Sequence, residues 1–481
     1  MANSNGWGDG AANNSIGWGQ GANNNIGWGS SHATSWASAT DIVGITTDPA
    51  ASAYFTATGI TGATEQQAID NLVKGLKADG LWSKMKAVYP FVTDQRNLAS
   101  FTEDFSNAAW TKEFATITAN TTTDPNGTTT ADTFQGNGAN NYHQLIQSGV
   151  VLTSGSTYTT SIYAKKNTNN FIQIVGTGNA YPLTTYANFD LNNGVVGSYG
   201  ANVTPTITSV GNGWYRCTMT AAATLTSSSN SFIVGLITSA SSSRVEINTL
   251  ATSVFLWGAQ LELGSTATTY QPQSGSAQAV IASQFKYNLV NPVDSDAAFR
   301  LVFNGGWTHS SNGATPNGTN GYADTKLVAN TAMNFNSQSF SDYLGTNPVA
   351  PTTCQFGSFT GTPFSGVSLF IRDGYNGMND NILSPTMTTS TQAGLFTLNR
   401  NNENTKKLFR NGSSIGSTSS TATNLSRGGI FIGANNQNGS TTYYSIAQHR
   451  FFSAGDGLTD TEAANLYTRV QAFQTSLSRQ V

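Results

Sequence analysis

Residues 254–263 decide the fold of the middle of this chain, with the sequence VFLWGAQLEL. Apolar and aromatic side chains recur there in the alternating manner of a β-strand. Two other stretches have the same character, YTTSIYA at 158–164 and WYRCTMT at 214–220. Turn clusters separate such stretches, for example NNG at 192–194 and GNG at 211–213. Short strands broken by turns at this spacing predict a β-sandwich, and we expect Trp214 and Trp257 to lie in its core.

A second all-β region follows residue 277. Its clearest signal is LFRNG at 408–412, where an Asn-Gly pair lies inside a hairpin pattern. Two helices flank the strands. The first spans 64–80, with Thr64 and Gln67 as a predicted capping box, and the second spans 459–477, with Thr459 and Glu462 in the same roles. The predicted fold class is therefore all-β, with two β-sandwiches, two short flanking helices and an extended N-terminal arm.

The N-terminal arm repeats one short phrase three times. The sequences NGWG, IGWG and IGWG place Trp7, Trp18 and Trp28 in equivalent positions, and the second and third copies add Ile16 and Ile26. No Lys, Arg, Asp or Glu lies between residues 9 and 41. So much Gly and Asn cannot pack a core, and large aromatic side chains are costly to leave in water. We interpret these five residues as attachment anchors that enter repeated pockets on a partner; the alternative is a disordered linker.

The composition restricts the function classes. Charged residues are 10% of the 481 and the formal net charge is −3, so no basic field attracts nucleic acid or an anionic membrane. A surface of hydroxyls and amides suits neutral, hydroxylated ligands such as glycans, or else an inert extracellular coat.

The two cysteines, Cys217 and Cys354, lack zinc-site spacing, and a disulfide between them is not expected. No apolar run is long enough to span a membrane. No secretory signal is visible, so synthesis in a host cytoplasm is expected.

Several segments resemble known families of phage structural proteins. Residues 98–270 resemble the carbohydrate-binding-module-like jelly rolls of phage tail and virion proteins; five stretches carry this, at 101–112, 158–165, 189–191, 207–217 and 256–262. Residues 287–477 resemble a laminin-G or concanavalin-like lectin domain, through 408–416, 430–433, 444–452 and 457–467. The Trp-Gly arm resembles the N-terminal repeats of phage fibre proteins.

The resemblance implies a structural virion protein of a tailed phage, a fibre or decoration protein that displays glycan-binding-like modules for host-surface adhesion. It implies capsid or tail proteins as partners of residues 1–40, host surface glycans as ligands, a homotrimer, and a place on the virion surface. Neither nucleic acid nor a membrane is an expected partner. A polysaccharide-degrading enzyme and a secreted bacterial adhesin are the alternatives.

We predict that the jelly roll is inserted into the lectin-like domain, because jelly-roll termini lie close together and the helical segment before it has an apolar face to bury. The alternative is simple tandem order. The predicted parts are the attachment arm (1–40), a connector (41–63), the helical front part of the lectin-like domain (64–95), the inserted jelly roll (96–276) and the lectin-like domain (277–481).

The sequence predicts no enzyme. Hydrolases of sandwich fold need a close pair of carboxylates, and adjacent Glu103 and Asp104 would point to opposite faces of a strand. The four histidines are scattered and no catalytic motif accompanies them. No cofactor is expected except a structural Ca²⁺, for which Glu103, Asp104 and Glu262 are the weak candidates; ordinary surface acids are the alternative.

Glycan binding requires exposed aromatic rings beside amides and hydroxyls. Aromatic residues in polar, loop-like surroundings are the candidates, with packing or subunit contact as the alternative role for each. They are Tyr142, His143, Tyr181, Trp307, His309 and Tyr375.

Overall fold

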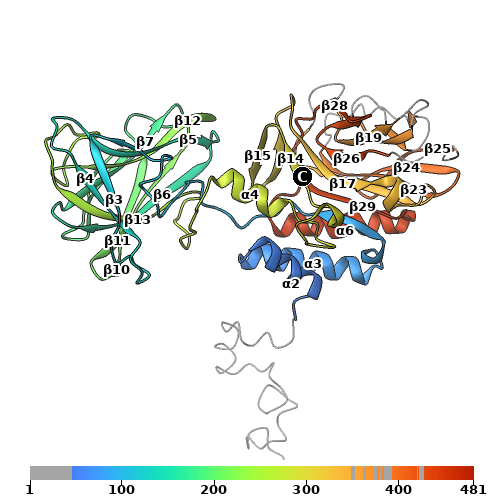
Figure 1. Ribbon diagram of the computed structural model, residues 1–481, viewed down its shortest axis with the longest axis horizontal. Coiled ribbons are helices and arrows are strands. Elements are labelled where there is room, and N and C mark those ends of the chain that lie inside the picture. Colours follow the sequence, from blue (N-terminus) through green and yellow to red (C-terminus); the bar gives the residue numbers. More distant parts are fainter. Residues whose placement is uncertain are drawn as a thin grey trace, which may run out of the picture. The chain divides into compact units, whose positions relative to one another are not determined.

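The computed structural model describes residues 46–347, 353–360, 365–371, 376–378, 382–383, 393–419, 421 and 427–481. Within them the protein is mostly β-sheet, and the predicted all-β class is confirmed (Figure 1). The attachment-arm residues Trp7, Trp18, Trp28, Ile16 and Ile26 and the candidate Tyr375 lie outside the described residues.

The jelly roll consists of two six-stranded antiparallel sheets (Figure 1). The first contains, in spatial order, β10 (Val203–Gly211), β11 (Trp214–Ala222), β6 (Thr157–Lys166), β13 (Ser253–Leu263), β4 (Ala131–Gly136) and β3 (Ala115–Thr122). The second contains β2 (Thr111–Glu113), β5 (His143–Leu152), β12 (Ser227–Leu236), β7 (Phe171–Gly178), β8 (Tyr186–Asp190) and β9 (Val195–Tyr199). Among the described strands, these pair only with one another.

The jelly-roll core lies between these sheets and is apolar. Phe105, Trp110, Phe134 and Phe189 are its large fully buried side chains. Trp214 and Trp257 are also buried, as predicted, but they belong to a separate small cluster. Both cysteines are buried and free, which agrees with the expectation of no disulfide.

The C-terminal sandwich also has two sheets. Its eight-stranded sheet contains β15 (Trp307–Ser310), β16 (Gly313–Pro316), β29 (His449–Gly455), β18 (Gln338–Leu344), β23 (Gly394–Asn402), β24 (Thr405–Arg410) and β25 (Ser413–Ser419), with β1 (Met85–Tyr89) paired to β29. Its nine-stranded sheet contains β14 (Val302–Asn304), β17 (Tyr322–Val328), β26 (Gly429–Ile432), β19 (Phe356–Thr360), β20 (Ser365–Leu369), β21 (Asn376–Met378), β22 (Ile382–Leu383), β27 (Asn435–Gln437) and β28 (Ser440–Thr442).

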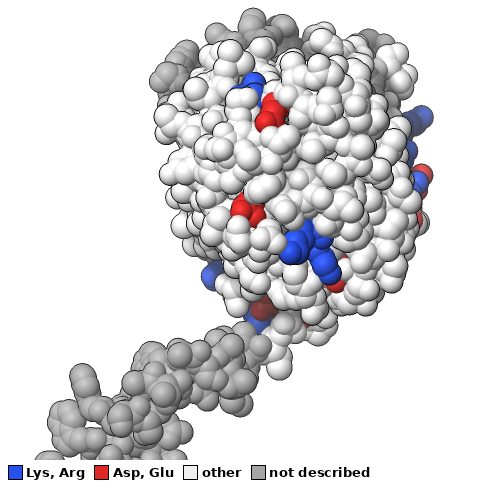
Figure 2. Space-filling view, turned by 90° about the vertical axis from the view of Figure 1, so that its left-hand side faces the viewer, with Lys and Arg blue, Asp and Glu red and all other residues white. Residues whose placement is uncertain are grey.

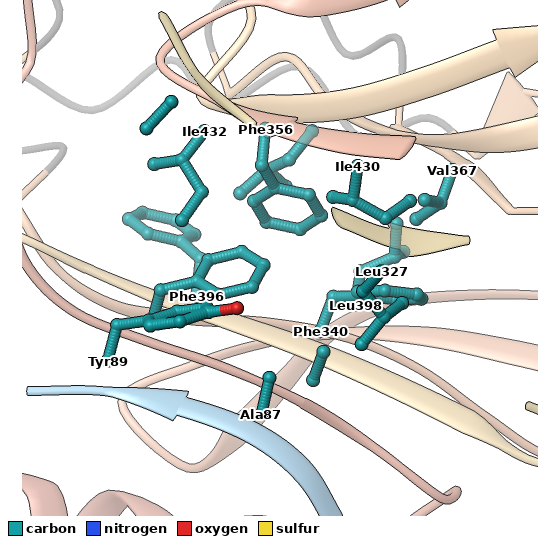
Figure 3. Close-up of a cluster of buried hydrophobic side chains, with 14 of the residues drawn as sticks. Ala87, Tyr89, Leu327, Phe340, Phe356, Val367, Phe396, Leu398, Ile430 and Ile432 are labelled. Carbon is teal, nitrogen blue, oxygen red and sulfur yellow. The ribbon is translucent and has the colours of Figure 1, made fainter. Parts of the chain in front are cut away.

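The core between these two sheets is rich in aromatic side chains. Figure 3 shows Phe340 and Phe396 from one sheet with Phe356 and Ile432 from the other. Tyr89 of β1 belongs to the same cluster and stacks on Phe452 with ring centroids 6.1 Å apart. Chain from before residue 96 therefore completes a sheet whose other strands all come after residue 300.

The helices are α2 (Pro49–Thr58), α3 (Ala63–Ala78), α4 (Ala277–Phe285), α5 (Ala329–Ala332) and α6 (Asp460–Ser476), with the 3₁₀ turns η3 (Trp82–Lys84) and η4 (Asp296–Ala298). Of these, α2, α3 and α6 cover the outer face of the eight-stranded sheet, while α4 and α5 contribute side chains to the core between the two sheets. Apolar residues of α3 and α6 share one buried cluster with Tyr343 of β18 and Phe451 of β29. Arg469 of α6 joins the helices by donating to both carboxylate oxygens of Asp79, at 2.8 and 2.9 Å.

The segment predicted as a connector, 41–63, contains a helix that was not predicted, because residues 49–58 form α2. Pro49 stands at the first helical position, where its missing N–H costs nothing. Ala51, Tyr54 and Thr58 recur at helical spacing and are buried, so the helix is stabilised by packing that the Gly- and Thr-rich composition around it did not indicate.

One of the two predicted capping boxes is present. Thr459 accepts from Glu462 N, and the Glu462 carboxylate accepts from Thr459 N. The Thr64–Gln67 box is wrong: the helix cap is Gly62, without a side-chain hydrogen bond. The Asp94 carboxylate accepts instead from the N–H groups of Thr61 and Gly62, at 2.7 and 2.9 Å.

Candidate functional site

The jelly roll carries a hollow of about 330 Å³ on its surface. Its walls are the turn that precedes β2, the end of β3, the start of β4 and the chain after β13. The lining residues are Phe101, Glu103, Asp104, Asn120, Thr130, Pro272, Gln273 and Ser274. A concave site with a few convergent polar groups is the usual form of a small-ligand site.

Long-range hydrogen bonds hold the two sides of the hollow together. Thr102 N donates to Gln273 O at 2.8 Å, and Gln273 N donates to Thr102 Oγ1 at 2.9 Å. The buried Trp110 indole donates to the carbonyls of Ser100 and Phe101 at 3.0 Å each. The wall that carries Glu103 and Asp104 is thus fixed before any ligand arrives, which lowers the entropic cost of binding.

Glu103 and Asp104 line the same hollow, contrary to the prediction that they face opposite ways. They lie in a turn rather than a strand, so the alternation of a strand does not apply to them. Burial raises the pKa of Glu103; a hydrogen bond from Tyr270 opposes this and the nearby Asp124 adds to it. Asp104 accepts from Ser106 Oγ at 2.6 Å and Asn107 N at 3.1 Å.

Thr130 is positioned from two sides. Its hydroxyl donates to the Asp124 carboxylate and accepts from the Trp257 indole at 3.1 Å. Burial by itself would raise the pKa of Asp124, but hydrogen bonds from Thr128 and Thr130 outweigh it and leave the pKa below its usual value. Trp257 packs on Tyr270 with ring centroids 4.7 Å apart, so an aromatic cluster supports this wall.

The hollow has negative character. No Lys or Arg lines it, and the cation near Asp104, Lys112, donates to the carbonyls of Ser106 and Asn107 at 2.8 and 2.7 Å. Burial lowers the pKa of Lys112, while Asp104 and Asp132 oppose the change. Beyond these groups the surface is sparsely charged: Figure 2 shows a face on which few Lys, Arg, Asp and Glu side chains are scattered among uncharged ones. The site is suited to hydroxyl and ammonium groups and repels anions.

The three weak calcium candidates do not form one site, because only Glu103 and Asp104 line the hollow. Glu262 is fully buried, and its carboxylate accepts from Thr268 N at 2.9 Å, Thr268 Oγ1 at 2.6 Å and Gln260 Nε2 at 2.6 Å. Glu262 does not line the hollow with Glu103 and Asp104. In the described part of the chain, no three His, Cys, Asp or Glu side chains are grouped to hold a metal ion.

The predicted aromatic residues lie in different surroundings. Tyr142 is half-buried and packs edge-on against Phe114, with ring centroids 5.8 Å apart. His143, predicted to be in a loop, is the first residue of β5 and is 1% exposed, with Nδ1 2.6 Å from Phe114 O. Tyr181 is half-buried against Gly176, and burial raises its pKa above the usual range. Of these three, Tyr142 is the one that contacts an exposed aromatic ring, that of Phe114, which is 39% exposed.

Trp307 and His309 belong to the C-terminal sandwich. Trp307 donates to Asn304 O at 3.1 Å and packs on Phe303, with ring centroids 5.2 Å apart. His309 is 6% exposed, and burial lowers its pKa to about 4. His309 packs inside the sandwich, and Trp307 is half-buried against its core, so the polar residues around them in the sequence did not indicate full exposure.

A histidine–carboxylate pair also lies in this sandwich. His449 Nδ1 is 2.9 Å from the Asp342 carboxylate, and both residues are completely buried. Burial raises the pKa of Asp342, and His449 opposes the change. Because both side chains are inaccessible to solvent, a polymeric substrate cannot reach them. The His449–Asp342 pair is therefore a structural element of the core.

Most of the hollow could not be predicted from the sequence. Phe101, Asn120, Thr130 and Gln273 come from four separate stretches, and nothing in any one stretch indicates that they converge. The sequence did not indicate the exposed position of Phe114. Its backbone is left-handed, with φ of 49°, a conformation that bulky residues seldom adopt. The pattern SNAAWTKEFA around it contains no turn signal that would have revealed this conformation.

No family model matches this sequence, and no curated protein matches it. In the described part of the chain, no helix has the length and hydropathy needed to cross a membrane. Among solved structures, TmCBM61 in complex with β-1,4-galactotriose is similar at 11% identity, covering 35% of this chain and all of the other, with a TM-score of 0.22.

Two structures from Paenibacillus barcinonensis Xyn10C are also similar. The CBM22-2 xylan-binding domain has 13% identity over 34% of this chain and 98% of its own, with a TM-score of 0.22. The CBM22-1–CBM22-2 tandem has 12% identity over 76% of this chain and 98% of its own, with a TM-score of 0.23. At these values the similarity assigns no ligand, and the function proposed below rests on the residues of the site.

Proposed function

We propose that this protein is a structural virion protein of a tailed phage, a fibre or decoration protein whose jelly roll binds host-surface glycans. The observation that carries the glycan-binding part is the hollow: a preformed concavity lined by carboxylate, amide and hydroxyl groups on a sparsely charged module. Sugar hydroxyls both donate and accept hydrogen bonds, and Glu103, Asp104, Asn120 and Thr130 offer complementary groups within one small volume.

The binding test is an array of immobilised glycans probed with the full chain. Glu103→Gln and Asp104→Asn keep the shape of the hollow and remove one negative charge each. We expect each to weaken binding about tenfold, the loss of about one charge-assisted hydrogen bond. The matched control is Glu403→Gln, which neutralises an exposed carboxylate of the other sandwich. Unchanged binding by both hollow variants would remove the hollow from the proposal.

The alternative function, polysaccharide degradation, is tested on the same glycans. Release of reducing ends by the parent protein, lost in Glu103→Gln, would replace adhesion with hydrolysis. Binding without release supports the adhesive function, because a binding module holds its ligand unchanged.

The virion part of the proposal rests on the Trp-Gly repeats of residues 1–40 and on the resemblances in the sequence. We expect deletion of residues 1–40 to leave a folded protein that no longer joins particles made of capsid and tail proteins. Trp18→Ala and Trp28→Ala should each reduce occupancy without changing the melting temperature. Incorporation of the deletion variant at the parental level would contradict the anchor role.

We also propose a homotrimer on the virion surface. Several copies held together convert weak single-site contacts into useful avidity without any new contact. Native mass measurement at micromolar concentration tests this directly: a stable monomer would contradict the trimer while leaving single-site glycan binding intact.

A further inference from the structure

The jelly roll presents a second surface feature, a corner made by the rings of Phe114 and Tyr142. The ring centroids are 5.8 Å apart and the ring planes meet at 89°. Phe114 lies between β2 and β3, is 39% exposed, and belongs to none of the buried apolar clusters. No residue that lines the hollow takes part in this corner, so the two features are separate.

The backbone of Phe114 is held in an unfavourable conformation. Its φ of 49° lies in the left-handed region, which costs a bulky residue conformational energy. Two donors fix its carbonyl: Asn137 N at 3.0 Å and the ring nitrogen Nδ1 of buried His143 at 2.6 Å. The surrounding structure thus holds Phe114 in a strained backbone conformation while its ring stays partly exposed to solvent. Such strained residues are concentrated at functional sites.

An exposed aliphatic side chain lies next to this corner. Asn141 and Asn248 exchange both backbone hydrogen bonds at 3.0 Å, forming an isolated antiparallel bridge. Ile247 precedes Asn248 in the chain and is 64% exposed. The bridge thus places the segment that carries this exposed aliphatic side chain beside the segment of Tyr142.

Amide groups border this surface. The loop at 137–141 has the sequence NGANN and carries no charge. The nearest acid in the other bordering loop, Glu246, is already engaged by Thr238, which donates from its N–H and its hydroxyl at 2.7 Å each. An apolar corner with an amide border matches the face of a pyranose ring, whose C–H groups pack on aromatic rings while its hydroxyls bond to amides at the edge.

We propose that Phe114 and Tyr142 form a second carbohydrate site, in which one ring stacks on the apolar face of a neutral pyranose and the other closes its edge. Neutral polysaccharides are its ligand class, because the bordering loop at 137–141 offers amides and carries no charge. This site deepens the proposed function but does not depend on the hollow, since the two share no residue.

The test uses the full chain and an array of neutral and acidic polysaccharides. Phe114→Asn removes the ring and places a residue that tolerates the left-handed conformation, so the fold should be retained, as its melting temperature will verify. Tyr142→Ala removes the second ring. The matched control is Leu183→Ala, which removes a 79% exposed apolar side chain from the same module.

We expect Phe114→Asn and Tyr142→Ala to weaken binding to neutral polysaccharides about tenfold, which corresponds to about 1.4 kcal/mol, while Leu183→Ala binds like the parent. Loss in Glu103→Gln with parental binding by Phe114→Asn would overturn this inference and keep the hollow. Loss in Phe114→Asn with parental binding by both Glu103→Gln and Asp104→Asn would support this site and overturn the hollow.

Three other outcomes would overturn the second site. The first is the absence of binding to any glycan, which would overturn the proposed glycan binding as well. The second is an equal loss in Leu183→Ala, which would indicate nonspecific adhesion. The third is a change of native mass in Phe114→Asn, which would show that the corner is a contact between copies of this chain.

Discussion

The jelly roll closes its main core with apolar side chains from one continuous run of chain, residues 105–259, whereas the C-terminal sandwich assembles its core from residues 87–91 and 281–454. The C-terminal sandwich also buries a histidine–carboxylate pair and Arg479, which is 3% exposed. The apolar core of the jelly roll is thus contiguous in the chain, while the core of the sandwich comes from two segments that other groups must join. The sandwich is therefore expected to be the more sensitive of the two to single substitutions and to pH.

Arg479 is the group that joins the segments most directly. Its guanidinium donates to the carbonyls of Pro90 at 2.9 Å, Phe91 at 2.7 Å and Ser311 at 3.1 Å, and to Gln474 Oε1 at 2.8 Å. Burial and the neighbouring Arg450 lower its pKa to about 9, so it remains charged at neutral pH.

The largest expected effect is that of Arg479→Met. This change leaves several buried carbonyl groups without donors, at a cost of about 3 kcal/mol or more, which lowers the melting temperature of the sandwich by roughly 10 °C. Calorimetry should show that the jelly-roll transition is unmoved. Arg300→Met, which removes an exposed guanidinium from the same sandwich, is the control. Equal movement of both transitions would contradict the independence of the two sandwiches.

The second prediction concerns acid. Because burial lowers the pKa of His309 to about 4 against about 6.5 when unfolded, the unfolded chain binds a proton in this window that the folded chain does not. Above pH 6.5, His309 makes its full contribution to the free energy of unfolding. As the pH falls to about 4, this contribution decreases by about 3 kcal/mol. Burial raises the pKa of Asp342. Protonation of its carboxyl on acidification therefore adds stability and opposes the loss from His309.

The variant His309→Phe isolates this contribution, since a phenyl ring can keep the edge-on packing with Phe303, whose ring centroid is 4.6 Å away. Urea unfolding at pH 7.5 and 4.5 should show a smaller loss of stability for the variant than for the parent. A pH dependence identical to that of the parent would assign the acid response to other groups.

The third prediction compares one turn from each sandwich. Gly412 has φ of +76°, and a Cβ there would lie 3.0 Å from Ala464 Cα; Gly211 has φ of +92° and no atom within 4 Å of such a Cβ. Gly211→Ala should cost about 1 kcal/mol from the left-handed backbone alone. Gly412→Ala should cost more, because α6 must also move. If the two variants lost equal amounts of unfolding free energy in urea, α6 would be shown to move at no energetic cost.

The smallest effect is expected from removing residues 96–276 and joining the ends with a short Gly-Ser bridge. The two ends lie together: Arg96 N donates to Gln271 Oε1 at 2.8 Å, and Gln271 Nε2 donates to Asp94 O at 2.7 Å. We expect the remainder to unfold cooperatively within a few degrees of the parental sandwich. The matched control, residues 280–481 alone, lacks β1 and α3 and should be unstable. Equal stability of both would favour tandem domains over an insertion.

The sequence by itself determined what depends on neighbouring residues. The alternation in VFLWGAQLEL predicts β13, and the Asn-Gly pair at 411–412 predicts the turn between β24 and β25. Thr459 and Glu462, three residues apart, predict the N-terminus of α6. In each case the interacting groups are close in the chain, so the local pattern contains the whole physical reason.

Only the tertiary structure decided what depends on distant residues. Asp94 accepts from the N–H of Gly62, the N-cap residue of α3, although it lies more than thirty residues away, and the two sides of the hollow come from residues 101–130 and 272–274. The exposed ring of Phe114 depends on Asn137 and His143, which hold its carbonyl. Local propensity cannot indicate such features, because burial and hydrogen bonding across the fold supply the free energy that overrides it.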